Sequence, residues 1–240
     1  MLHRFYQSQL NPRDNRLTIT DPAVIKQVIH VLRLKVGETF VVFTPQVEYT
    51  VSIDHTADDA IQLRIIKIEP ASRLPLRRLV LYPALLKKDN FELILQKCTE
   101  LGVEEFVPLI TERTIVREMS RHKQERYRKI LTEATEQCGG TATPVLGQPI
   151  TLSALAQTLA AMPGTAMAAY ESETRQPLYH ALTRATDPIR LIIGPEGGFT
   201  PDEMTLLQHA GVSTVHLGPR ILRAETAAIA ATSIIMLSSR

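Results

Sequence analysis

The sequence predicts a protein of the α/β class, in which a mostly β N-terminal domain precedes a mainly parallel sheet with helices on both faces. Residues 1–70 contain three β-rich runs, whereas strand-like and helix-like segments alternate from residue 79 onward. Such alternation is typical of βαβ units, which build parallel sheets. A Pro- and Arg-rich stretch separates the two patterns. We therefore expect domains at 1–70 and 79–240, joined by a linker at 71–78.

The N-terminal domain is expected to form a small β-barrel with one helix. Strands are predicted at 39–44, 47–55 and 60–68, and polar turns separate them. The helix follows Asp21, a favourable N-cap residue, and Pro22 suits its first position. Its apolar stripe extends to Arg33 and consists of Val24, Val28, Val31 and Leu32.

The C-terminal domain is expected to alternate strands with amphipathic helices. Strands are predicted at 79–86, 106–110, 166–170, 189–193 and 214–217. Helices are predicted after Asp89, from Ser120 and over 151–161, and the first two end at Gly102 and Gly139. A further helix begins at a capping box formed by Thr200 and Glu203, with Pro201 in its first turn. Helix capping explains both residues, so we assign them no chemistry.

Composition narrows the class of protein. Hydrophobic residues make up 44% of the 240 residues and charged residues 22%, as in ordinary globular domains. The N-terminus lacks the apolar run of a signal peptide, and the longest apolar stretch, at 227–237, is too short to span a bilayer. The two cysteines have no neighbouring metal-ligand pattern. We expect a cytoplasmic protein with no metal site and no membrane partner.

Positive charge is concentrated in one stretch. Residues 113–129 hold seven Lys and Arg but only two acidic residues, Glu118 and Glu125. A clustered basic surface suits a polyanion such as RNA. A solvated helix face would show the same pattern, so charge alone does not decide between the two.

Two glycine-containing segments, at 191–203 and 217–227, are the most informative part of the chain. Each is an apolar strand that stops in a Gly/Pro turn and restarts as a helix. Two such strand ends side by side in a parallel sheet form a crevice where ligands bind. The first turn lacks the Lys-Ser/Thr of a phosphate loop. Because Glu196 and Asp202 would repel an anion, we expect a neutral or cationic ligand.

The last helix, from 224 to 237, is nearly all small or apolar, and Arg220, Arg223 and Glu225 cluster where it begins. A helix without a polar face is expected to be buried all round. For a terminal helix, this favours a subunit interface over an internal core.

Several motifs in order resemble one enzyme family. They include His-Val-Leu-Arg at 30–33 and Ile-Gly-Pro-Glu-Gly-Gly at 193–198. The others lie at 87–103, 108–116, 136–139 and 217–226. Together they resemble the 16S rRNA (uracil(1498)-N(3))-methyltransferases of the SPOUT class, which use S-adenosylmethionine. The likeness runs nearly end to end.

The resemblance implies a PUA-like RNA-binding barrel, a SPOUT methyltransferase domain with a C-terminal trefoil knot, and a homodimer. The expected activity is methylation of the N3 of a 1498-type uridine in the 16S rRNA of the small ribosomal subunit. The implied cofactor contacts are Tyr170, Glu171, Ile193, Gly194, Pro195, Glu196, Gly197, Gly198, Leu217, Gly218, Ile221, Leu222 and Arg223.

Catalytic and RNA-binding roles follow as hypotheses. Arg223 is expected to stabilise negative charge on the uracil, and Glu225 is a candidate base, although a carboxylate at a helix N-terminus also has a purely structural explanation. The candidate RNA contacts are Arg4, Arg13, Arg16, His30, Arg33, Lys35, Arg117, Arg121 and Arg128.

The sequence departs from the pattern of similar sequences at two places. Gly140 replaces an arginine usual in similar sequences, and Thr44, Pro45 and Gln46 replace a common Asp-Gly turn.

The main alternative function is that of a non-catalytic rRNA-binding or ribosome assembly factor. Retention of both glycine turns argues against it. A nucleotide hydrolase is disfavoured because the phosphate-loop lysine is missing.

Overall fold

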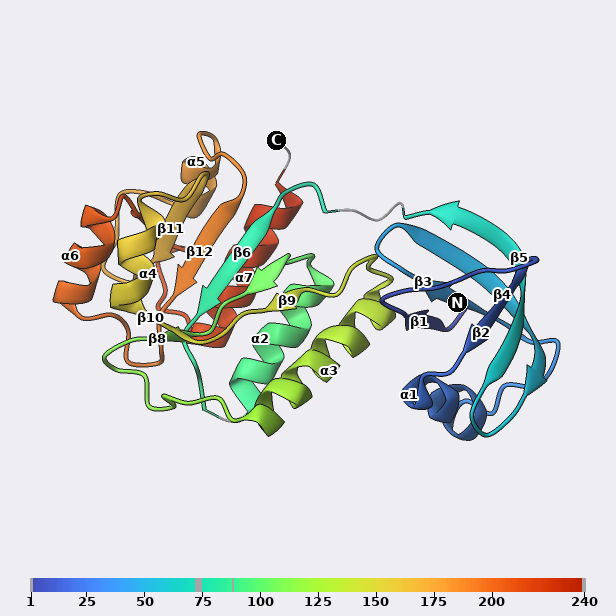
Figure 1. Ribbon diagram of the computed structural model, residues 1–240. Coiled ribbons are helices and arrows are strands. Elements are labelled where there is room, and N and C mark those ends of the chain that lie inside the picture. The colour runs from blue at the N-terminus through green and yellow to red at the C-terminus, as the bar shows by residue number, and fades with distance from the viewer. Residues whose placement is uncertain (1, 72–74, 88, 239–240) are drawn as a thin grey trace. The chain divides into compact units, whose positions relative to one another are not determined.

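The computed structural model describes residues 2–71, 75–87 and 89–238, and these residues form two compact units (Figure 1). The N-terminal unit contains the described residues up to 71 together with 135–143, and the C-terminal unit contains the rest. The expected C-terminal domain, 79–240, included residues 135–143, whereas the structure groups these residues with the N-terminal unit. Of the expected linker, 72–74 lie outside the described residues, whereas 75–78 belong to the C-terminal unit, where the buried Arg77 lies 3.5 Å from the Asp187 carboxylate.

A five-stranded sheet organises the N-terminal unit. Its strands are β1 (Arg4–Tyr6), β2 (Arg16–Ile19), β3 (Thr39–Phe43), β4 (Val47–Thr56) and β5 (Ile61–Pro70). Their order is β1-β3-β4-β5-β2, and only the β1–β3 pair is parallel. The three predicted strands are confirmed as β3, β4 and β5. Strands β1 and β2 were missed because three and four residues are too few to establish an alternating pattern.

The predicted N-terminal helix exists but changes type. The Asp21 carboxylate accepts the Ala23 N–H at 2.8 Å and caps α1 (Pro22–Ile25), which continues as the π-helix η1 (Lys26–Val31). Val24 and Val28 are buried as expected, but Val31 is 65% exposed. The prediction for Val31 is wrong because the wider turn of a π-helix shifts later residues away from a 3.6-residue stripe.

Six parallel strands form the main sheet of the C-terminal unit, so the mainly parallel α/β prediction is confirmed. They are β6 (Leu79–Pro83), β7 (Glu105–Phe106), β9 (Val145–Leu146), β11 (Thr165–Ala169), β12 (Ile189–Ile193) and β13 (Ser213–Val215). Their order is β13-β11-β12-β6-β7-β9. The predicted strand at 106–110 is instead split at Pro108 into β7 and β8 (Leu109–Ile110). Strand β8 pairs with β10 (Ile150–Thr151) in a separate ribbon.

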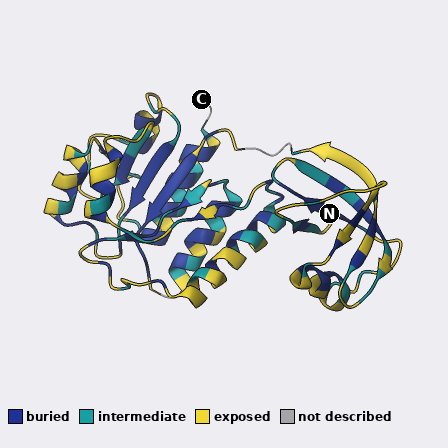
Figure 2. Cartoon of the chain, viewed as in Figure 1, coloured by how far each residue is buried: buried dark blue, intermediate teal, exposed yellow. Residues whose placement is uncertain are grey.

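Helices cover both faces of this sheet (Figure 1). One face packs against α2 (Asp89–Glu100), α3 (Arg121–Cys138), α5 (Leu178–Leu182) and α7 (Ala224–Leu237). The other packs against α4 (Leu152–Leu159) and α6 (Pro201–His209). Leu81 points to the first group and Val80 to the second, as strand alternation requires. Strands β6 and β12 are buried along their length (Figure 2).

Within the single chain, helix α7 is buried on one side only, so the expected burial all round would require a subunit interface, which stays a prediction. Ala224, Ala228, Ala231 and Ile235 lie in the core, and α7 packs against α2. On the opposite side Ile234 is 37% exposed and Leu237 is 72% exposed. Small apolar residues allow close packing on one side of a helix, but they do not require a second layer on the other side.

Candidate functional site

A cavity of about 570 Å³ opens at the carboxyl ends of β12, β11 and β13, entirely within the C-terminal unit. The two glycine turns that follow β12 and β13 form two of its walls. The sequence suggested that β12 and β13 lie side by side. In the structure they do not, because β11 lies between them. Tyr170 and Glu171, which follow β11, supply the third wall. The volume is typical of a small-molecule site.

Close backbone approach explains two glycines of the first turn. Gly198 has a φ of +68°, and a Cβ there would lie 2.5 Å from the Glu171 Oε1. At Gly194, a Cβ would lie 3.0 Å from the Phe199 ring. The Gly198 N–H donates to the Pro195 carbonyl at 2.9 Å and closes the turn. A larger residue at 198 would therefore push the Glu171 carboxylate aside and would adopt a left-handed conformation that disfavours a side chain.

The predicted capping box fixes where α6 begins. The Thr200 hydroxyl accepts the Glu203 N–H at 3.2 Å, and the Glu203 Oε2 accepts the Thr200 N–H at 2.9 Å. The turn and the helix after it are therefore held in one geometry.

The second turn carries the charged cluster. Gly218 has a φ of +121°, and its N–H donates to the His216 Nδ1 at 3.2 Å. Arg220 and Arg223 are exposed at the cavity, where Ile221 is 84% exposed. Arg223 occupies the N-cap position of α7. Two guanidinium groups are therefore available to a ligand at the mouth of the cavity.

Glu225 lies in the first turn of α7 and lines the same cavity. Its side chain is only 8% exposed, and its Oε2 is buried without a hydrogen-bond partner among the described residues. A buried carboxylate oxygen without a partner is unfavourable, so such groups often serve a ligand or a reaction. Glu225 can accept a proton or a hydrogen bond from a molecule in the cavity.

The third wall is held from behind by Glu173. Its carboxylate accepts the Thr214 hydroxyl at 2.6 Å and the Arg175 N–H at 2.7 Å. These hydrogen bonds lower the pKa of Glu173, and the bond from the Thr214 hydroxyl has the largest effect. The segment after Tyr170 is thereby tied to β13, the strand that leads into the second turn.

The structure brings together nearly all of the residues predicted to contact a cofactor. Ile193 is the exception, because it is 2% exposed in β12 and does not line the cavity. Sequence reasoning missed Asn90, at the start of α2, and His216, which both line it. Asn90 lies within the motif at 87–103 that carries the resemblance, whereas His216 belongs to no recognisable pattern.

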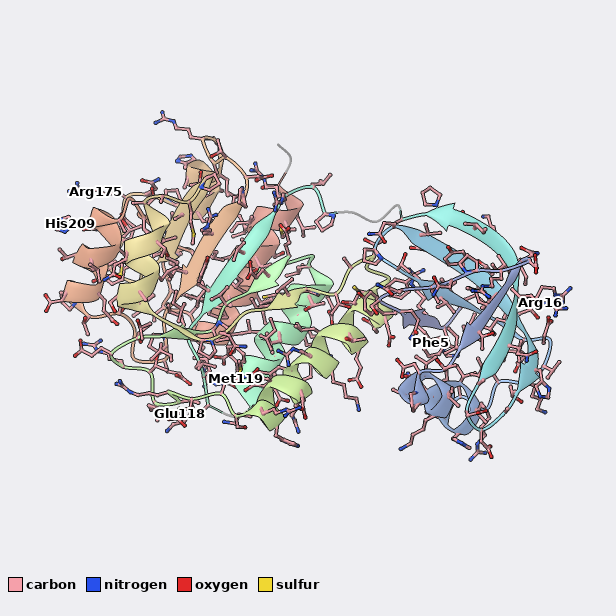
Figure 3. The ribbon with its side chains drawn as sticks, in the orientation of Figure 1. Phe5, Arg16, Glu118, Met119, Arg175 and His209 are labelled. Atoms are coloured by element: carbon pink, nitrogen blue, oxygen red, sulfur yellow. The ribbon has the colours of Figure 1, made fainter. Side chains whose placement is uncertain are left out.

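The candidate RNA contacts form one group in the N-terminal unit and one in the C-terminal unit, and all but Arg4 are exposed. Arg4 must be removed from the set, because its side chain is only 9% exposed and pairs with Glu48. Phe5 lies inside the N-terminal unit, whereas Arg16 lies at its surface (Figure 3). The other basic candidates are exposed: Arg13, Arg16, His30, Arg33 and Lys35 in the N-terminal unit, and Arg117, Arg121 and Arg128 in the C-terminal unit.

The part of the chain that the structure describes contains no cluster of three or more His, Cys, Asp or Glu residues that could hold a metal ion. No helix in this part is both long and apolar enough to cross a membrane.

A sequence profile of RNA methyltransferase domains matches residues 72–236. The chain belongs to the RNA methyltransferase family. The Ribosomal RNA small subunit methyltransferase E of Synechocystis sp. is 35% identical to this methyltransferase over 201 residues, which are 82% of the chain and 65% of that relative. The protein of the same name from Rickettsia conorii is 29% identical and covers 98% of the chain, with 95% of its own length matched. The resemblance drawn from the motifs is thereby confirmed.

Solved structures give the same result for the fold. A methyltransferase of Legionella pneumophila in complex with bound S-adenosylmethionine matches with a TM-score of 0.85 and 31% identity, covering 98% of this chain and 97% of its own. A Ribosomal RNA small subunit methyltransferase E of Neisseria gonorrhoeae, bound to S-adenosyl methionine, also has a TM-score of 0.85, at 27% identity, covering 97% and 96%. The methyltransferase thus has the fold of proteins that were solved with this cofactor.

Proposed function

We propose that this enzyme transfers a methyl group from S-adenosylmethionine to 16S rRNA of the small ribosomal subunit, at the N3 of a 1498-type uridine. One observation carries the proposal: three loops enclose a cavity at adjacent strand ends, in a fold whose solved relatives bind S-adenosylmethionine. The names of the curated relatives support small-subunit rRNA as the substrate.

The residues of the cavity fit this cofactor. When bound, S-adenosylmethionine supplies a methyl group on a positively charged sulfonium sulfur. Glu171, Glu196 and Glu225 line the cavity, and their carboxylates suit a cation better than a phosphate. The glycine-rich backbone at 194–198 and at 217–218 allows close approach of a ligand. Tyr170 and Glu171, the turn at 194–198 and the turn at 217–223 would hold the cofactor.

Arg223 and Glu225 would act on the uracil. The N3 of uracil carries a proton and attacks a methyl group well only when that proton is removed. Glu225 would accept the proton, because it offers a carboxylate oxygen without a partner among the described residues. Arg223 would donate hydrogen bonds to the uracil oxygens as negative charge spreads onto them. The deprotonated N3 would then accept the methyl group that the bound cofactor supplies, and S-adenosylhomocysteine would be the leaving group.

A comparison of pH–rate profiles tests Glu225. Glu225→Gln should lower the rate of methyl transfer about 10²–10⁴-fold, the usual contribution of a positioned base. A carboxylate that merely interacts with the helix dipole would leave the chemical step and its pH profile unchanged. That result would remove Glu225 from the mechanism, and Arg223→Lys provides the parallel test of charge stabilisation.

We propose that RNA contacts the eight exposed basic residues of the two groups defined above. Phosphate contacts release counterions, so affinity for small ribosomal subunits should fall steeply as salt rises. Substitution of Arg121 by Met should reduce that salt slope by about one unit. A flat salt dependence would contradict this assignment.

The N-terminal unit would serve as a PUA-like RNA-binding barrel, and the C-terminal segment would be tied in a trefoil knot. The protein would act as a cytoplasmic homodimer. The outer side of α7 supports self-association, because the apolar side chains of Ile234 and Leu237 are exposed there in the single chain. Light scattering of wild type and Leu237→Glu tests the dimer, and an unchanged monomeric mass for both would contradict it.

Transfer of a labelled methyl group to purified small subunits that lack the modification tests the reaction. Nucleoside mass spectrometry should identify 3-methyluridine. Another methylated nucleoside would keep the enzyme class and overturn the target. Binding of the subunit without any transfer, and without cofactor binding, would favour the non-catalytic assembly factor.

A further inference from the structure

Two adjacent residues, Glu112 and Arg113, contact the first glycine turn from outside the cavity. The Arg113 Nη1 donates to the Gly197 carbonyl at 2.6 Å, and the Glu112 N–H donates to the Glu203 Oε1 at 2.8 Å. Both residues lie more than 80 positions away from their partners, in the segment that follows β8. This segment therefore holds both the turn and the first turn of the helix after it.

The contact with Gly197 fixes a peptide plane. The Gly198 N–H, on the other side of the same peptide bond, donates to the Pro195 carbonyl at 2.9 Å. Since the peptide unit is planar, partners on both its C=O and its N–H determine its orientation. The Arg113 guanidinium thus sets the direction of the backbone in a turn that lines the cavity.

Packing reinforces the hydrogen bond. A Cβ on Gly197 would lie 3.3 Å from the Arg113 Cδ and 3.5 Å from its Cβ. The aliphatic stem of Arg113 therefore rests on the α-carbon of Gly197. This explains a glycine at 197, where the backbone has no positive φ that would require one.

The segment that carries Arg113 is itself well ordered by hydrogen bonds. Thr111 and Thr114 are 3% and 2% exposed, and their hydroxyl groups lie 2.9 Å apart. The Thr111 N–H donates to the Thr114 hydroxyl at 3.0 Å, and the Arg117 Nη2 donates to the Glu112 carbonyl at 3.0 Å. Arg113 thus extends from a fixed base, and its hydrogen bond can position the turn rather than merely follow it.

The role of Glu203 changes accordingly. Its Oε2 completes the capping box with the Thr200 N–H, while its Oε1 accepts the Glu112 N–H. One carboxylate therefore links the helix start, the turn and the external segment. Helix capping alone, which the sequence suggested, explains only one of its two oxygens.

We propose that Arg113 is a positioning residue that presets the turn at 194–198 for the cofactor, an inference that rests on the proposed function. Arg113 begins the basic stretch at 113–129, whose clustered charge suits a polyanion such as RNA. Its Nη1 instead donates to the Gly197 carbonyl, in the turn that would hold the cofactor. Loss of Arg113 should therefore weaken the binding of S-adenosylmethionine even when no RNA is present.

Calorimetry of the full chain with S-adenosylmethionine, in the absence of RNA, tests this role. Arg113→Met keeps the stem and removes the donors, and it should raise the Kd about tenfold, the effect of losing roughly one charged hydrogen bond. Arg113→Lys keeps a charged donor and should recover part of the loss. Lys129→Met removes one positive charge from the same stretch, far from the turn in sequence, and should leave the Kd unchanged.

The rates and stabilities provide independent readouts. At saturating cofactor, the kcat of Arg113→Met should stay within about twofold of wild type, because Arg113 does not line the cavity. An unchanged Kd in Arg113→Met would overturn the inference, even if its Tm without ligand fell. An equal rise of Kd in Lys129→Met would overturn it too, since the effect would then be one of net charge. Failure of wild type to bind the cofactor would instead refute the proposed function itself.

Discussion

Arg4 and Glu48 form a bidentate ion pair across the N-terminal sheet, with N–O distances of 3.0 and 2.8 Å. Arg4 begins β1 and Glu48 lies in β4, so the pair bridges β3, which runs between them. The Arg4 guanidinium also lies 4.8 Å from the centre of the Phe43 ring. A residue that looked like an RNA contact in the sequence therefore holds three strands together.

Loss of Arg4 should destabilise the N-terminal unit. Arg4→Met removes two hydrogen bonds to the largely buried Glu48 carboxylate and the contact with the Phe43 ring, which should lower the free energy of unfolding by about 2–4 kcal/mol. Urea denaturation measures the change. Arg64→Met serves as the control, because Arg64 is exposed beside Asp54 and should contribute under about 1 kcal/mol. Equal effects of the two variants would mean that burial of the Arg4 pair does not matter.

Gly198→Ala should impair the cofactor site more than the fold. The new Cβ would meet the Glu171 carboxylate and would occupy a left-handed conformation, which costs about 1–2 kcal/mol. We expect the Kd for S-adenosylmethionine to rise at least tenfold, as measured by calorimetry. Gly211→Ala is the matched control, because Gly211 has a φ of +81° but no atom within 4 Å of its Cβ position. It should be destabilised by backbone strain but should bind the cofactor normally.

Local patterns account for the elements that the sequence predicted correctly. Strands β3 to β5 and β12 have long alternating or apolar runs, and the capping box at Thr200 is encoded within four residues. Strands β1 and β2 depend on pairing with distant strands, so three or four residues gave no signal. The π-helix η1 departs from the periodicity on which helix prediction rests.

The site was predictable to the extent that its residues are adjacent in the chain. The two glycine turns were visible as motifs, but the position of β11 between them is a property of strand order. The Arg4–Glu48 pair and the Arg113–Gly197 contact join residues 44 and 84 positions apart. Arg4 was a candidate RNA contact and Arg113 begins the basic stretch at 113–129, because a single sequence does not show which side chains already have partners.

The two cysteines should differ in reactivity. Burial raises the pKa of Cys98 to about 12, whereas Cys138 is half-buried near the end of α3. Since the thiolate is the reacting form, iodoacetamide should modify Cys138 in the folded protein and Cys98 only after denaturation. Mass spectrometry of peptides from native and denatured samples measures this. Labelling of Cys98 as fast as that of Cys138 under native conditions would contradict the packing of α2 against α7.

Glu173 should contribute to stability in a pH-dependent way. Hydrogen bonds, chiefly from the Thr214 hydroxyl, lower its pKa below the ordinary 4.5, so the folded state favours the ionised form. Its contribution is fully present above the unfolded pKa and is lost as pH falls through the lower, folded pKa. Glu173→Gln should therefore be less stable than wild type at about pH 7, by under about 1 kcal/mol because the group is partly solvated. The difference should vanish in strong acid.

Urea midpoints of both proteins, measured from neutral pH downward, test this dependence. Thr214→Val is the matched variant, because it removes the strongest of these hydrogen bonds but keeps the carboxylate. Its Glu173 should titrate closer to 4.5, and NMR of the carboxyl group would report the shift. Because Glu173 ties the segment after Tyr170 to β13, both variants should also bind S-adenosylmethionine more weakly. A stability difference that is the same at every pH would show that Glu173 acts by packing and not by its charge.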